Sequence, residues 1–288
     1  MKNIILLIIF FVFKVSSIKA MDWPMDDNTV LVNNFGFNNK GRPILGSVFE
    51  GEGKIKAVDK GEIIYSSTGK ESRSRLPSPL GSWNAVDHGN GLISIYSRYE
   101  ENSLTQKTSI EKGTEIASSG MSGWSGNNGL YFILYDQKEQ TWINPSLIIT
   151  PFSDTVPPQI TGIQLYDANG KLVENPQFGK LKQGKYNIKV NVFDILTDEK
   201  RKPLAPYRII SSVNGEETAM LTFDTMSTRE GELMVNRNGL IPARRIYAAQ
   251  SGFLASEVQL NRGLVMLEII VMDISGNASS ILARMTVE

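Results

Sequence analysis

The chain has 288 residues, with 30 basic and 30 acidic side chains, one histidine and no cysteine. This balanced charge argues against a nucleic-acid-binding protein, which would carry a basic face. The lack of cysteine excludes disulfides and thiolate metal sites, and a single histidine excludes any metal centre that needs two. Because 41% of the residues are hydrophobic, the chain can bury a substantial core.

Residues 1–20 have the pattern of a secretory signal peptide. Lys2 precedes an unbroken apolar run from Ile4 to Phe13, and small residues lead to Ala20. We expect cleavage after Ala20, export, and a periplasmic or cell-envelope location. An uncleaved anchor is the alternative, although the run is shorter than the roughly 20 apolar residues of a membrane span. No transmembrane segment is expected in the mature chain.

The remaining sequence predicts an all-β fold, because short alternating or β-branched segments are separated by Gly, Asn, Asp and Pro. Before residue 150 the expected strands are Lys54–Val58, Gly61–Ser66, Trp83–Asp87, Leu92–Tyr99, Thr114–Ser118, Leu130–Tyr135 and Ser146–Ile149. After it they are Gln159–Asp167, Tyr186–Phe193, Tyr207–Val213, Glu216–Phe223, Leu264–Asp273 and Ser280–Val287.

A proline-rich segment divides this series of strands. Thr150–Pro158 contains Pro151 and the tandem Pro157-Pro158, which suits a stiff, extended linker. The predicted organisation is a signal peptide (1–20), a first domain (21–150), a linker (151–157) and an immunoglobulin-like antiparallel β-sandwich (158–288).

A set of short motifs in the first domain is more specific than the strand pattern. In chain order the motifs are Ile55–Ile63, Val86–Gly91, Tyr96–Tyr99, Ile110–Ile116, Ser119–Ser125, Gly129–Phe132 and Trp142–Pro145. Over roughly residues 35–149, the order and spacing of these motifs resemble those of the lysostaphin/LytM-type zinc peptidases, which cut peptide cross-links of peptidoglycan. The resemblance implies the β-sheet fold of that family.

The same resemblance implies zinc ligands and catalytic histidines that this sequence lacks. The H-x-x-x-D positions fall on Ile44 and Val48, the Y-x-H position on Arg98, and the H-x-H positions on Gly129 and Tyr131. Aliphatic side chains offer no lone pair, a phenol titrates near 10, and an arginine repels a metal cation. We therefore expect no metal, no other cofactor and no catalytic residue at these positions.

The groove that the family uses for its substrate is the candidate binding site. The expected contacts are aromatic, amide and cationic, which suits glycan or peptide: Arg98, Tyr131, Tyr96, Trp124, Asn127 and Asn128. Arg98 is expected to pair with a peptide carboxylate. The alternative is that many of the aromatic rings fill the sheet core. The single histidine, His88, is interpreted as a hairpin residue without a metal.

The preferred function is that of an exported, catalytically inactive homologue of peptidoglycan metalloendopeptidases, which acts as a cell-wall binding or regulatory module. Its partner would be peptidoglycan or a cell-wall hydrolase, and not nucleic acid. The alternatives are an active zinc metalloendopeptidase that cuts peptidoglycan cross-links and a structural envelope protein. In the second domain, the acidic turns at Asp167–Gly170, Asp194 and Asp273–Asn277 allow calcium coordination or simple turn formation, and turn formation is preferred.

Overall fold

The computed structural model describes residues 21–25, 29–68, 78–105, 107–173, 180–197, 202–247 and 252–288. The predicted signal peptide, residues 1–20, lies outside them. None of the helices in these ranges is long and apolar enough to cross a membrane. The described chain is almost entirely β-structure, so the predicted fold class is confirmed.

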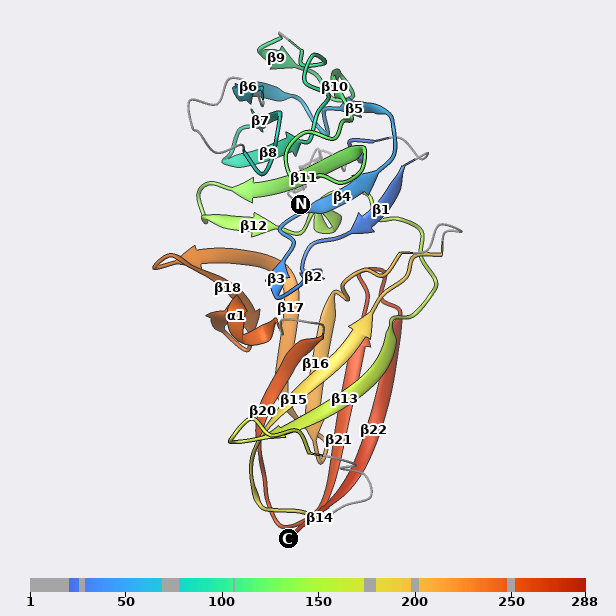
Figure 1. Cartoon of the computed structure of the whole chain (residues 1–288), viewed down its shortest axis with the longest axis vertical. Helices are drawn as coiled ribbons and strands as arrows, with labels where there is room; N and C mark the ends of the chain where they lie inside the picture. The colour runs from blue at the N-terminus through green and yellow to red at the C-terminus, as the bar shows by residue number, and fades with distance from the viewer. Residues whose placement is uncertain are drawn as a thin grey trace, which may run out of the picture.

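The described residues of the first half of the chain form twelve strands and one short 3-10 helix (Figure 1). They are β1 (Val30–Asn33), β2 (Asn38–Asn39), β3 (Arg42–Pro43), β4 (Ser47–Glu50), β5 (Lys54–Lys56), β6 (Gly61–Ser67), β7 (Trp83–Asp87), β8 (Leu92–Ser97), β9 (Ser109–Ile110), β10 (Glu115–Ser118), β11 (Gly129–Asp136), β12 (Thr141–Ile143) and the 3-10 helix Pro145–Leu147.

In the second half, the part of the chain that the structure describes forms ten strands and one helical turn. They are β13 (Gln159–Asp167), β14 (Lys180–Leu181), β15 (Gly184–Phe193), β16 (Arg208–Val213), β17 (Glu216–Arg229), β18 (Glu232–Arg237), β19 (Leu240–Pro242), α1 (Ala243–Ile246), β20 (Phe253–Leu260), β21 (Gly263–Met272) and β22 (Ala278–Val287).

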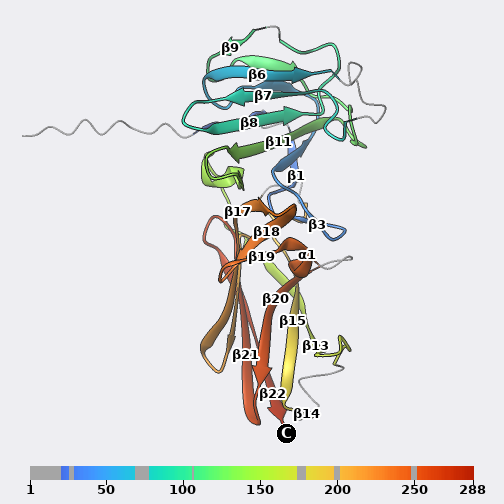
Figure 2. The ribbon, with the colours of Figure 1, turned by 90° about the vertical axis from the view of Figure 1, so that its left-hand side faces the viewer.

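One hydrogen-bonded sheet runs through both halves in the order β14-β22-β21-β16-β17-β12-β11-β8-β7-β6-β9. All neighbours in it are antiparallel except the short pair β14 and β22. The halves join where β12 pairs with β17, with Trp142 opposite Met226. A smaller sheet, β13-β15-β20, faces the lower part of the long sheet, and together they form the predicted β-sandwich (Figure 2).

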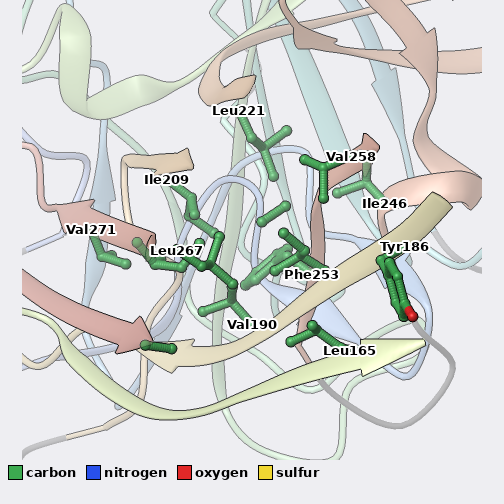
Figure 3. Close-up of a cluster of buried hydrophobic side chains, with 14 of the residues drawn as sticks. Leu165, Tyr186, Val190, Ile209, Leu221, Ile246, Phe253, Val258, Leu267 and Val271 are labelled. Carbon is green, nitrogen blue, oxygen red and sulfur yellow. The ribbon is translucent and has the colours of Figure 1, made fainter. Parts of the chain in front are cut away.

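Alternating side chains of these strands fill two hydrophobic cores. In the sandwich, Val190, Leu221, Phe253 and Leu267 are almost completely buried between the two sheets (Figure 3). In the first half, the side chains of Tyr96, Leu130, Phe132 and Leu134 are fully buried. This alternation leaves the intervening residues of β11 on the opposite face of the sheet.

The expected strand Ser146–Ile149 is wrong. Pro145 opens a 3-10 helix there, and the Asn144 side chain accepts a hydrogen bond from the backbone N–H of Ser146. Proline fixes φ near −65° and lacks a donor, so it suits the first position of a helix better than a strand interior. Asn144 also donates from Nδ2 to the carbonyl of Phe223, which fastens this turn to β17.

Candidate functional site

The positions that correspond to the family's zinc ligands and catalytic histidines lie on or next to three adjacent strands. In β11, Tyr131 lies opposite Val48 of β4 on one side and opposite Ser97 of β8 on the other. Gly129 lies two residues before Tyr131, so it shares the same face. Arg98 follows β8 directly, and the backbone N–H of Leu45, next to Ile44, donates to the Tyr131 hydroxyl at 3.2 Å. We call Ile44, Val48, Arg98, Gly129 and Tyr131 the degenerate centre.

In the middle of this centre, the guanidinium group of Arg98 lies over the phenol ring of Tyr131. The Arg98 guanidinium carbon lies 5.3 Å from the centre of the Tyr131 ring, within the range of a cation–π contact. Burial raises the pKa of Tyr131, although the Leu45 N–H and Arg98 oppose the shift, so the phenol is neutral at physiological pH. Burial lowers the pKa of Arg98, opposed by Tyr131 and Glu50. Arginine nevertheless keeps its charge.

Arg98 also has an uncommon backbone. Its φ is +74°, in the left-handed region that costs a residue with a Cβ about 1 kcal/mol or more. Its N–H donates to the Leu80 carbonyl at 3.0 Å, which fixes the peptide. The Nε atom of its guanidinium is buried without a hydrogen-bond partner in the described structure. The arginine is therefore held in place by its surroundings and extends only partly into solvent.

Tyr96, predicted as a groove contact, is a core residue. Its side chain is 0% exposed, packs on Phe132 with ring centres 5.2 Å apart, and its hydroxyl accepts a hydrogen bond from the Val58 N–H at 3.0 Å. Burial raises the pKa of Tyr96 to about 12. A ligand in solvent does not reach this ring, so the alternative of core filling applies to Tyr96.

The loop of residues 119–128 carries the other predicted contacts, and its two asparagines hold it to the end of β4. Asn127 Nδ2 donates to Glu50 Oε1 at 2.7 Å, and the Asn128 carbonyl accepts from the Gly51 N–H at 2.9 Å. Trp124 is 72% exposed, although its backbone N–H donates a hydrogen bond to the Pro79 carbonyl. The loop therefore has an ordered backbone with an exposed indole.

An open cleft of about 950 Å³ lies beside this loop. Its lining residues are Glu52, Gly53, Lys54, Tyr99, Glu100, Glu101, Ser118, Ser119, Gly120, Met121, Ser122 and Asn128. Three of these are glutamates, whereas the one lysine already forms an ion pair with Glu115. The cleft borders the degenerate centre, because Gly120 in its wall pairs with Gly129 through two backbone hydrogen bonds.

Residues 44–145 match the sequence model of peptidase family M23. We call this segment the M23 domain after this match. A second family model matches residues 157–288. No curated protein matches the sequence.

Several solved structures resemble the chain in fold. One is the SpoIIQ–SpoIIIAH pore-forming complex, with 17% identity, 46% of this chain and 92% of that chain covered, and a TM-score of 0.38. The catalytic domain of the prophage-encoded M23 protein EnpA from Enterococcus faecalis has 16% identity, 44% and 95% coverage, and a TM-score of 0.36. Lysostaphin from Staphylococcus simulans has 16% identity, 71% and 82% coverage, and a TM-score of 0.33.

The residues of this M23 domain do not fit a catalytic zinc. Such a site needs three N, O or S ligands from the protein and an open position for water. Ile44 and Val48 have no donor atom, and the neutral Tyr131 hydroxyl already accepts a hydrogen bond. At Gly129 a Cβ would collide with the carbonyl oxygen of Phe49, so this backbone leaves no room for a histidine. The positive charge of Arg98 opposes a cation as well.

His88 does not compensate for the missing ligands of the M23 domain. Its Nδ1 lies 2.7 Å from the Lys60 carbonyl and its Nε2 lies 2.7 Å from Ser94 Oγ. Both ring nitrogens are therefore engaged in holding the hairpin between β7 and β8, in keeping with the structural role expected for this residue.

Sequence reasoning missed most of the cleft. Of the six predicted contacts, only Asn128 lines it. The pairs Glu52-Gly53 and Glu100-Glu101 flank short strands, and acidic residues at such places resemble ordinary solvated turns. Their convergence results from the pairing of β5 with β10, which the sequence pattern does not specify. Met121, which is 63% exposed, gave the only local signal: a large apolar residue in a glycine-rich loop.

Proposed function

We propose that this chain is an exported, catalytically inactive M23 protein that acts as a cell-wall binding module. The observation that carries the proposal is the chemistry of the degenerate centre, where Ile44 and Val48 replace ligands and Arg98 lies on the neutral Tyr131 phenol. Such a centre cannot activate water for peptide hydrolysis through zinc. Export rests on the signal-like pattern of residues 1–20.

The ligand that we propose is the peptide part of peptidoglycan, bound in the cleft. The carboxylates of Glu52, Glu100 and Glu101 line that cleft and favour a ligand with amino groups, which wall peptides carry. Met121 and Trp124 expose apolar surface on the adjoining loop, and an exposed indole is an effective anchor for peptide or sugar. Arg98 lies on the Tyr131 ring in the degenerate centre and is not among the residues that line the cleft, so it has no direct contact with the ligand in this proposal.

A sedimentation assay with purified peptidoglycan tests the binding. We expect the wild-type chain to sediment with the polymer, and Trp124→Ala to bind at least about tenfold more weakly, because hot-spot aromatics typically contribute 2 kcal/mol or more. The matched control is Leu264→Ala, since Leu264 is 67% exposed on β21 of the sandwich. No sedimentation of the folded wild-type chain would refute this function, whereas equal sedimentation of all three would refute the role of Trp124 as an anchor.

An activity assay tests the second half of the proposal. Release of soluble fragments from labelled peptidoglycan is expected to stay at background with or without added zinc. Without protein ligands, zinc is not held in the domain and cannot activate water there. Zinc-dependent release by the wild-type chain would instead establish an active endopeptidase. The two assays are independent, so binding without release is the specific result expected.

A further inference from the structure

Three aspartates converge where the predicted linker meets the sandwich. Asp154 belongs to the linker, Asp194 follows β15 and Asp273 follows β21. One carboxylate oxygen of each lies within 4.8 Å of the others. Asp194 and Asp273 are only 5% and 2% exposed. Three acidic groups are thus gathered, two of them away from water, where each raises the cost of ionising the others.

Turn formation does not account for this arrangement. Asp273 does begin a turn, because its Oδ1 accepts from the Asn277 N–H at 2.9 Å, and Asp154 Oδ1 accepts from Thr197 Oγ1 at 2.7 Å. Two carboxylate oxygens of the cluster, however, are buried without any hydrogen-bond partner in the described structure: Asp194 Oδ1 and Asp154 Oδ2. An unpartnered buried oxygen is costly, and here both belong to one cluster.

The electrostatics of Asp194 agree with the geometry. Burial, Asp273 and Asp154 together raise the pKa of Asp194 to about 7, opposed only by a backbone hydrogen bond. No lysine or arginine among the described residues forms an ion pair with any of the three aspartates. Among the described residues, the negative charge of the three aspartates is therefore not balanced by an ion pair.

We infer that Asp154, Asp194 and Asp273 form a calcium site that fastens the linker to the β-sandwich. Calcium takes six to eight oxygen ligands in flexible geometry, from carboxylates, carbonyls, amides and water. Magnesium requires stricter octahedral geometry and retains its waters, and zinc prefers nitrogen or sulfur. Three carboxylates from separate segments match calcium best.

Such an ion would have a structural effect beyond the charge it neutralises. The linker is already held here by neutral contacts, since Asn277 Nδ2 donates to the Asp154 carbonyl at 3.2 Å and the Thr155 N–H donates to Thr197 Oγ1 at 2.9 Å. Calcium would add bonds from one linker residue to the ends of two sandwich strands. This inference is independent of whether the M23 domain binds peptidoglycan.

Calorimetry and thermal unfolding of the purified chain, stripped with EDTA, test the site. Calcium chloride is expected to bind with about one ion per chain and to raise Tm by about 5–10 °C at a hundredfold excess over Kd. It is also expected to slow proteolytic cleavage between residues 151 and 157. No heat of binding and no shift in Tm, or a shift with magnesium but none with calcium, would overturn the assignment.

Two variants and a control localise the effect. Asp194→Asn and Asp273→Asn should lose at least about tenfold in calcium affinity, because each removes one of three anionic ligands. Asp194→Asn should also leave the metal-free Tm unchanged or higher, since it relieves repulsion, and this readout excludes a simple folding defect. Asp167→Asn is the matched control, because Asp167 Oδ1 caps a turn of the same domain outside the cluster. Equal calcium binding by all three variants would refute the site.

Discussion

The degenerate centre and the aspartate cluster are opposite cases of metal chemistry in one chain. The first lies in the segment that matches the M23 model, at positions where the resemblance implies zinc ligands, yet it offers aliphatic side chains and an arginine. The second lies at the edge of a β-sandwich and offers three carboxylates within 4.8 Å of one another. The comparison teaches that donor atoms and local charge decide metal binding, and that the fold only determines where the site would be.

Burial shifts a pKa in each of the two regions, in opposite directions. In the degenerate centre it lowers the pKa of a cation, Arg98, whereas in the cluster it raises the pKa of an anion, Asp194. Each shift records a charge that has lost part of its hydration. A metal ion would add to the unfavourable charge in the first region and cancel it in the second, so the same ion is repelled in one and attracted in the other.

The most severe test of the comparison restores one ligand to the degenerate centre. We expect Val48→Asp to lower the free energy of unfolding by about 3–5 kcal/mol, because it places a carboxylate without a partner at a position that is 4% exposed. Urea denaturation measures the change, with Ile64→Asp, at 53% exposure on β6, as the nearly neutral control. Recovery of stability on adding zinc would show that the centre retains enough ligands to bind it.

A smaller effect is expected from filling the space at the first H-x-H position. Gly129→Ala should cost about 1–3 kcal/mol, because the new Cβ collides with the Phe49 carbonyl and the strands must shift. Gly126→Ala serves as the control, since nothing lies within 4 Å of a Cβ at Gly126. Equal denaturation midpoints for the two variants would mean that this part of β11 adapts easily and that a histidine could be accommodated.

The smallest expected effect separates backbone strain from side-chain contact at Arg98. Both Arg98→Ala and Arg98→Gly lose the contact with Tyr131, but only glycine relieves the positive φ, so the glycine variant should be more stable by about 1 kcal/mol. Arg208, which lies 5.4 Å from the Tyr207 ring and belongs to β16, gives the reverse order, because glycine weakens a strand. If the glycine variant were the more stable one at both positions, or the less stable one at both, the backbone strain inferred at Arg98 would be contradicted.

The sequence was sufficient for the fold class, and the family resemblance for the place of the degenerate centre, where Tyr131 lies opposite Val48. Strand alternation and the glycine-marked turns predict β6–β8 and β11 closely, and the motif spacing brings Val48 and Tyr131 onto facing strands. Short strands such as β1–β4 carry too few residues for a periodic signal. The cleft and the convergence of Asp154, Asp194 and Asp273 could not be predicted, since both bring together residues that are distant in sequence and meet only in the folded chain.

Thr141–Ile143 in β12 pairs with Thr225–Ser227 in β17, so the two halves are joined by strand hydrogen bonds as well as by the linker. Cleavage of the linker alone would therefore leave them in contact. A chain severed within 151–157 and separated would expose two unsatisfied strand edges, one on each fragment, and would uncover Trp142, which packs against the sandwich core. Exposed edges of this kind seek new strands. The separated halves are therefore prone to recombine with each other or to aggregate, and expression of either half alone requires a substitute for the lost neighbour.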